Sequence, residues 1–339
     1  MTQALSVKGL VRTRRQVLKS SRFCKLGVSL AVVLAAGFTS AATASADKIL
    51  LFGPSVSGGA SSVEAQQAAA QGLGVDVASA AAWSSMTTAQ FAAYRAIVIS
   101  DNHDSGDVTD LAAAEANASV WGAAVNGNVI ITGADPEYHA DPAGGGDPGA
   151  VTYVNKAVGF AAGSPTQTGA YIALDGYYRD TSPNAPTKVL DAFAPGGFTS
   201  TSRSDDTIRI DPAVTGPSGL SDQILSNWGE TTHSFFTKYP SAFKVWAIGL
   251  DASGPYTTSN GQKGFPNFLA RAALPIPSTP PSCVVPKLKG KSVKKSKKKL
   301  RNGNCRLGKK KGHGKKVKKQ KPKAGTVLPE GSTVKVTVH

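Results

Sequence analysis

Acidic and histidine side chains gather in two short polar segments of the sequence, residues 101–107 and residues 133–139. Each segment directly follows an apolar run that is typical of a buried strand. A carboxylate close to an imidazole can act as a general acid or base, so a hydrolytic site is one hypothesis for these segments. Polar segments that only cap helices are the competing interpretation. The candidate residues are Asp101, His103, Asp135 and His139.

The sequence lacks the established motifs for catalysis and for metal or cofactor binding. It contains no G-x-S-x-G turn that would carry a serine nucleophile. The segment from Asp101 has a glycine at the sixth place of a calcium loop, but Ala112 stands where the acidic twelfth residue is required. The turn at Gly53–Gly59 is neither a dinucleotide-binding loop nor a Walker loop. We interpret His233 as a packing histidine on an aromatic helix face, and we predict no metal and no cofactor.

The two polar segments lie within a regular alternation of strands and helices. Apolar and amphipathic runs follow each other without long polar gaps, which predicts an α/β fold with a mainly parallel sheet. In such folds ligands bind beyond the carboxyl ends of the strands, where both segments would lie. The predicted strands are 48–52, 75–77, 96–100, 129–132, 170–174, 207–210 and 243–250, and the predicted helices are 62–72, 87–91, 107–126, 153–160, 187–193, 232–236 and 265–273.

Three segments of residues 47–274, which we call the body, carry a family resemblance. They are the strand Lys48–Phe52, the segment Leu220–Gly229 and the strand Val245–Ile248. With these segments the body resembles the class I glutamine-amidotransferase-like proteins, which implies a flavodoxin-like sheet. The enzymes of that family use a cysteine on a sharp turn after a central strand, but the body contains no cysteine. The turn at Gly133–Asp135 offers no thiol, so the amidotransferase activity is not expected here.

The first 46 residues are predicted to be an export signal. They contain seven basic residues and no acidic one, and an apolar run, Leu26–Phe38, leads to small residues that end at Ala46. Within the basic part, Thr13–Lys19 resembles the twin-arginine export motif, with Val17 where Phe is usual. We predict cleavage between Ala46 and Asp47. The apolar run is too short for a membrane span, so the mature chain is expected to be secreted and to have no transmembrane segment.

Residues 275–282 are predicted to be a linker between the body and residues 283–339, which we call the module. Four of these eight residues are proline, a composition typical of an extended spacer. Once the signal is removed, Cys283 and Cys305 are the only cysteines. An even pair within one small exported module predicts a disulfide. A metal site would need more ligands than this pair and His313 provide.

The module has the pattern of a folded domain despite its many lysines. Ser292 is predicted to cap a helix, and Thr333–Val338 alternates apolar and polar residues as a half-buried strand does. The order of Gly, Pro and Val resembles the PASTA domain, a small module of bacterial cell-wall enzymes and membrane kinases. Ser296 and Gly303 depart from the family pattern, and residues 309–319 are predicted to be an inserted lysine run. The matching residues are Val285, Pro286, Leu288, Gly290, Leu300, Gly308, Gln320, Pro322, Ala324, Gly325, Val327, Gly331, Val334 and Val336.

Charge and resemblance together predict what the module binds. It carries 20 of the 38 Lys and Arg residues and one acid, Glu330, whereas the body has a net charge of about −10. The PASTA resemblance implies peptidoglycan and related wall material as ligands, and the lysines predict binding to anionic wall polymers. The module contains no aromatic side chain for base stacking, which disfavours nucleic acid. The predicted binding residues are Lys309, Lys310, Lys311, Lys315, Lys316, Lys318 and Lys319.

These observations lead to one hypothesis with two alternatives. The chain is predicted to be an exported, non-catalytic binding protein associated with the cell wall, in which the module anchors the body. One alternative is a secreted hydrolase with its site at residues 101–107 and 133–139. The other is a lysine run that only increases solubility.

Overall fold

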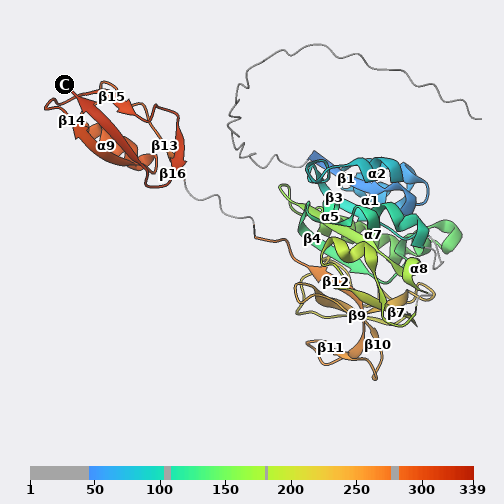
Figure 1. The fold of residues 1–339 in the computed structure, drawn as a ribbon. Helices are drawn as coiled ribbons and strands as arrows, with labels where there is room; N and C mark the ends of the chain where they lie inside the picture. Colours follow the sequence, from blue (N-terminus) through green and yellow to red (C-terminus); the bar gives the residue numbers. More distant parts are fainter. Residues whose placement is uncertain (1–45, 103–107, 180–181, 276–281) are drawn as a thin grey trace, which may run out of the picture. The chain divides into compact units, whose positions relative to one another are not determined.

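The computed structural model describes residues 46–102, 108–179, 182–275 and 282–339 (Figure 1). The predicted export signal up to residue 45, His103 and most of the predicted linker lie outside these ranges. The first strand begins at Ala46, so cleavage between Ala46 and Asp47 would leave that strand almost intact. Within the described ranges, no helix has the length and apolar character needed to cross a membrane.

The body is built on a nine-stranded mixed sheet. Five strands are parallel in the spatial order β2-β1-β3-β5-β4, and β12, β10 and β8 continue the sheet with antiparallel pairing. The strands are β1 (Ala46–Phe52), β2 (Gly74–Ala78), β3 (Tyr94–Ile99), β4 (Val125–Thr132), β5 (Thr168–Ala173), β8 (Ile208–Ile210), β10 (Lys244–Leu250), β11 (Tyr256–Thr257), which pairs with β12, and β12 (Lys263–Arg271). The predicted α/β fold is confirmed in this general form. Because β5 lies between β3 and β4, the strand order differs from the flavodoxin order 2-1-3-4-5.

Two apolar cores form the interior of the body, and both are lined by strands of the sheet. Ile49 and Leu51 of β1 belong to one core, and Leu50 and Phe52 belong to the other, as expected for a strand buried on both faces. Buried residues of α1 and α7 complete the first core, and those of α2 to α5 contribute to the second. These helices are α1 (Val63–Ala70), α2 (Ala80–Ser85), α3 (Thr88–Phe91), α4 (Ala112–Ala116), α5 (Ala118–Gly122) and α7 (Pro148–Ala161).

Shorter helical segments occupy the connections. The predicted helix 107–126 is interrupted: a 3₁₀ turn at Val108–Leu111 leads into α4, and Asn117 separates α4 from α5. The side-chain amide of Asn117 donates to the carbonyl of Trp83, which ties this break between α4 and α5 to α2. The remaining segments are α6 (Pro136–Ala140), α8 (Asp175–Tyr178) and 3₁₀ turns at Gly53–Ser55, Gly59–Ser61, Pro142–Gly144 and Lys188–Ala192.

Two predicted helices of the body are strands in the structure. Residues 232–236 belong to β9 (Thr232–Lys238), which pairs with β7 (Thr199–Asp205) in a second sheet of order β6-β7-β9, where β6 is Ala185–Pro186. Residues 265–271 belong to β12, which lies between β4 and β10. The prediction of helix was wrong for β12 because Phe268 and Leu269 are both fully buried, so the run has no period-two pattern. Pro266 does not distinguish helix from strand here, because it would lie in the first turn of the predicted helix, where proline is tolerated.

The module is a small α+β unit with its own core. Its strands are β13 (Ser282–Val284), β14 (Arg306–Lys311), β15 (Val317–Lys321), β16 (Val327–Pro329) and β17 (Thr333–Val338). β13 pairs with β16, and the order β14-β17-β15 forms a three-stranded sheet. The helix α9 (Val293–Asn302) begins after Ser292, whose hydroxyl accepts from the backbone of Lys295 as predicted. The predicted disulfide between Cys283 and Cys305 is present.

The lysine run of residues 309–319 is part of the module's sheet. It forms the end of β14, a turn and the start of β15. The apolar side chains of β17, Val334, Val336 and Val338, are buried in the core with Leu300 of α9. The lysines around them are exposed because they alternate with these core positions or flank them.

Candidate functional site

Five side chains that can carry charge meet at the carboxyl ends of the parallel strands. Asp101, Asp135 and Asp175 follow β3, β4 and β5 closely, His139 belongs to α6, and His233 belongs to β9. We call these five residues the carboxylate–histidine cluster. All five are buried, and the three aspartates have no exposed surface. Because the three strands are neighbours in the sheet, residues that are far apart in sequence come together at one edge.

His233 connects three carboxylates of this region. Its Nδ1 is in hydrogen-bond contact with the carboxylate of Asp175 and lies 3.9 Å from a carboxylate oxygen of Asp135. Its Nε2 lies 3.1 Å from a carboxylate oxygen of Glu230, a side chain that is 61% exposed. Burial alone lowers the pKa of His233, but the hydrogen bond to Asp175 and the nearby negative charges outweigh it, so the pKa is raised. Burial raises the pKa of Asp175 to about 7, although contact with His233 opposes this shift.

His139 and Asp101 complete the cluster from two other sides. Nε2 of His139 lies 3.1 Å from a carboxylate oxygen of Asp135 and 3.2 Å from the backbone carbonyl of Glu230. Burial lowers the pKa of His139, but its contact with Asp135 outweighs this and the pKa is raised. Asp101 accepts a 2.5 Å hydrogen bond from the backbone N–H of Gly176, the residue next to Asp175. The arrangement can hold a proton, or a cation, between carboxylates and imidazoles.

Two glutamates form a second buried acidic pair at the same end of the sheet. Glu64 of α1 accepts a 2.5 Å hydrogen bond from the hydroxyl of Ser100, and Glu137 of α6 accepts a 2.6 Å hydrogen bond from the backbone N–H of Ser57. Burial raises the pKa of Glu64 to about 7. Burial and the neighbouring charge of Glu64 raise the pKa of Glu137 to about 10. Glu137 also lines two small cavities of about 240 Å³ each, together with Ser57 and Asp141, so Glu137 lies close to solvent.

The position of β9 depends on a glycine and a buried amide. The backbone N–H groups of His233 and Ser234 donate to the carbonyl of Gly133, directly after β4. A Cβ atom on Gly133 would lie 2.3 Å from the carbonyl oxygen of Ser234, so only glycine permits this approach. Asn267 of β12 donates from its amide to the hydroxyl of Thr232 and to the carbonyl of Ser234. These contacts hold His233 over the end of β4.

The sequence predicted part of this cluster. Of the four candidate residues, Asp135 and His139 lie 3.1 Å apart, and Asp101 contacts the backbone of Gly176 beside Asp175. His103 lies outside the described residues. Asp175 was missed, although it follows a predicted strand just as Asp101 does. His233 was assigned to a helix face as a packing residue, but it lies on a strand and contacts Asp175.

The module contains a groove lined by lysines. It has a volume of about 870 Å³ and lies along the three strands β14, β17 and β15. Four of the seven predicted binding lysines line it, while Lys315, Lys316 and Lys318 do not. Lys321, Lys323 and Lys335 line it as well and were not predicted. We call the following seven residues the lysine face: Lys309, Lys310, Lys311, Lys319, Lys321, Lys323 and Lys335.

Like charges face each other directly on this surface. Lys321 of β15 and Lys335 of β17 are cross-strand partners, and both are exposed. Like charges directly opposite each other destabilise a sheet, and no described carboxylate lies within ion-pairing distance of either lysine. A bound polyanion would remove this repulsion.

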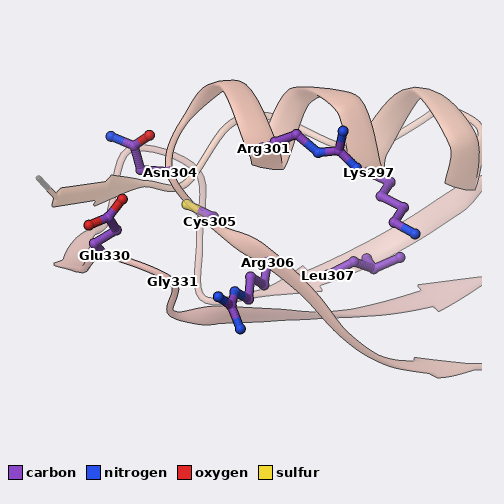
Figure 2. Close-up of a pocket in the computed structure, with 8 residues that line it drawn as sticks. All are labelled: Lys297, Arg301, Asn304, Cys305, Arg306, Leu307, Glu330 and Gly331. Carbon is purple, nitrogen blue, oxygen red and sulfur yellow. The ribbon is translucent and has the colours of Figure 1, made fainter.

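A second basic cleft of the module has a volume of about 700 Å³. Figure 2 shows Lys297 and Arg301 extending from α9 and Arg306 lying opposite on β14. Glu330 lies at the far end of the cleft, near Cys305 (Figure 2). Two guanidinium groups suit the recognition of carboxylates or phosphates, because each can donate two parallel hydrogen bonds.

Comparison with known proteins identifies only the module. No curated protein and no solved structure matches the chain. The resemblance of the body to the class I glutamine-amidotransferase-like proteins finds no support among the protein families. Residues 284–339 match the PASTA domain, in agreement with the Gly, Pro and Val pattern and with the β-α-β order seen in the structure. The chain therefore carries a PASTA domain at residues 284–339.

Proposed function

We propose that this protein is exported and binds the bacterial cell wall through its PASTA domain, without catalysis by that domain. The observation that carries the proposal is the lysine face on a PASTA fold, since the domain suggests a wall-related binding role. Export by the predicted signal would bring the chain to where wall polymers occur. The body would then be held at the wall to bind a further ligand or partner.

The chemistry of the lysine face favours anionic wall polymers over neutral glycan. Seven lysines share one groove, and Lys321 and Lys335 oppose each other across the strands. A chain of phosphates or carboxylates would neutralise several of these charges and release counterions, as a polyanion does on any basic surface. The cleft with Arg301 and Arg306 provides a second place for an anionic group. Peptidoglycan itself, through its peptide carboxylates, is the competing ligand.

The test is sedimentation of the mature chain, residues 47–339, with purified walls at increasing salt. We expect retention at low salt that weakens as salt rises, because exposed charges are screened. The double variant Lys321→Gln/Lys335→Gln should bind about tenfold more weakly. The matched control is Lys315→Gln/Lys318→Gln, which removes the same charge outside the groove and should have a smaller effect.

Two outcomes would contradict the proposal. Absence of retention at low salt would exclude wall binding by this module. Equal losses in the two double variants would show that net charge, and not the lysine face, determines binding. Walls from which the anionic polymers have been removed by acid separate the two ligand classes, because retention on such walls would indicate peptidoglycan.

The carboxylate–histidine cluster supports a second candidate function, a hydrolase acting at the cell surface. The specific observation is the contact of His233 with Asp175, which is the pairing that orients a histidine for general acid–base work. If the mature chain releases soluble fragments from walls, His139→Gln and His233→Gln should abolish the release with unchanged circular dichroism. No release by the unmodified chain would exclude wall hydrolysis.

A further inference from the structure

Three residues of the carboxylate–histidine cluster present their ligand atoms to a common point. One carboxylate oxygen each from Asp135 and Asp175 and one ring nitrogen of His233 all lie within 4.8 Å of one another. All three side chains are buried. Adjacent ligands of one ion at about 2.1 Å are about 3–3.4 Å apart, so the Asp135 carboxylate would move toward His233, which is 3.9 Å away. The Asp175 carboxylate, now hydrogen-bonded to Nδ1 of His233, would move away from it.

Asp135 is the residue that points most directly to a ligand. It occupies the N-cap position of α6, where an aspartate normally accepts a hydrogen bond from the first turn, yet its side chain makes no capping bond. It has no exposed surface, and neither of its carboxylate oxygens accepts a hydrogen bond from any described residue. Two histidine nitrogens lie near its carboxylate, Nε2 of His139 at 3.1 Å and Nδ1 of His233 at 3.9 Å. A buried carboxylate without hydrogen bonds is costly unless a cation or proton compensates it.

The surroundings of His233 match those of a metal-binding histidine. Its Nδ1 faces Asp175 and Asp135, while its Nε2 lies 3.1 Å from the Glu230 carboxylate. An ion bound at Nδ1 would displace the proton of the hydrogen bond to Asp175, and Nε2–H would then donate to Glu230, the kind of outer carboxylate that commonly orients a metal-binding imidazole. The backbone N–H of His233 also donates to the second oxygen of Asp175 at 2.5 Å, which leaves the other oxygen to face the common point. Glu230 is exposed, so an ion would enter the site from the solvent beside it.

We propose that Asp135, Asp175 and His233 bind one divalent transition-metal ion, Zn²⁺ or Mn²⁺, with His139 beside Asp135 as a further donor. Two oxygens and one imidazole nitrogen suit these ions, whereas Mg²⁺ and Ca²⁺ prefer oxygen ligands alone. Three protein ligands leave a coordination position open for water or substrate. The inference concerns the body and is independent of wall binding by the module.

The test is calorimetric titration of the metal-stripped mature chain with ZnCl₂, MnCl₂ and MgCl₂. We expect one bound Zn²⁺ or Mn²⁺ per chain and much weaker binding of Mg²⁺. Because an ion that binds only the native state stabilises it, the unfolding midpoint should rise by about 5–10 °C at a hundredfold excess over Kd. Loss of an outer partner typically weakens metal binding 10–100-fold, so Asp135→Asn and His233→Gln should each weaken it at least about 100-fold.

The control variant is His313→Gln, which removes an exposed histidine of the module and should leave the affinity unchanged. Circular dichroism of Asp135→Asn and His233→Gln shows whether each is folded, and either one suffices for the test. The proposal is overturned if neither Zn²⁺ nor Mn²⁺ binds the mature chain. It is also overturned if a folded Asp135→Asn or His233→Gln binds as tightly as the parent, because the ion would then lie elsewhere.

Discussion

Glu64 illustrates how burial makes a single residue sensitive to pH. Its carboxyl has no exposed surface and accepts a hydrogen bond from the hydroxyl of Ser100. Desolvation by burial raises its pKa from 4.5 to about 7, and Glu137 is raised in the same direction. Between these pH values the native state keeps a proton that the unfolded state releases. The free energy of unfolding therefore falls as pH rises from about 4.5 to about 7.

We predict that Glu64→Gln removes the contribution of Glu64 to this pH dependence, while Glu137 and Asp175, whose pKa values are also raised, keep theirs. The pKa shift of Glu64 corresponds to at most about 3 kcal/mol of unfolding free energy. The unmodified protein loses this free energy between pH 4.5 and pH 7.5, whereas the variant keeps it. The measurement is urea unfolding of the body at both pH values in the presence of EDTA. Asp47→Asn, at a side chain that is 80% exposed, serves as the control. The same loss of stability in the parent and in Glu64→Gln would refute the shift.

Among the secondary-structure elements, the position of β9 determines which residues form the cluster. It belongs to the smaller sheet with β7, yet its first residues lie against the end of β4. Asn267 of β12 connects the two sheets through Thr232 and Ser234, and it also accepts a 2.5 Å hydrogen bond from the backbone N–H of Gly249. The placement of His233 thus depends on one buried amide.

Asn267→Ala is expected to destabilise the body by about 3 kcal/mol or more. The substitution removes this partner from a buried backbone N–H and a carbonyl, and each such loss costs about 1–3 kcal/mol. The hydroxyl of Thr232 keeps its hydrogen bond to the carbonyl of Asp205. Chemical denaturation of the parent and the variant measures the difference. Asn260→Ala, in an exposed turn, removes one hydrogen bond of the Thr258 hydroxyl, which keeps its bond to the carbonyl of Gln262, so the stability should change by less than about 1 kcal/mol. Similar values for the two variants would show that the amide does not hold β9 in place.

The chain combines two units of opposite charge, which are stabilised by different interactions. The acidic body has two large apolar cores, whereas the basic module has one small core and a disulfide. Cys283 and Cys305 are separated by 22 positions, and closing a loop of this size stabilises a fold by about 3 kcal/mol. The mature chain contains no other cysteine.

Reduction is therefore predicted to destabilise the module and not the body. In differential scanning calorimetry of the mature chain, a reductant should lower or abolish the transition of the module and leave that of the body unchanged. Cys283→Ser/Cys305→Ser should show the same loss without reductant, because it removes the same cross-link. A body transition that shifts on reduction would show that the two units do not unfold separately.

Much of the local structure follows from the sequence. The buried parallel strands were predicted because short unbroken apolar runs such as Ala96–Ser100 are typical of strands that are buried on both faces of a sheet. The module was predicted from the spacing of Gly, Pro and Val and from the two cysteines. Each of these residue types has a structural role that depends mainly on its local sequence. Ser292 was predicted as a helix cap because a serine hydroxyl satisfies free backbone N–H groups.

Tertiary structure alone decided the strand order, the strands β9 and β12, and the full composition of the cluster. Phe265–Arg271 has no period that separates strand from helix, so its pairing with β4 and β10 determines its conformation. His233 lies 98 positions after Asp135, and only the approach of β9 to Gly133 brings the two to 3.9 Å. Local sequence determines which residues are buried or can cap, but contacts between distant strands depend on packing energies that no local pattern contains.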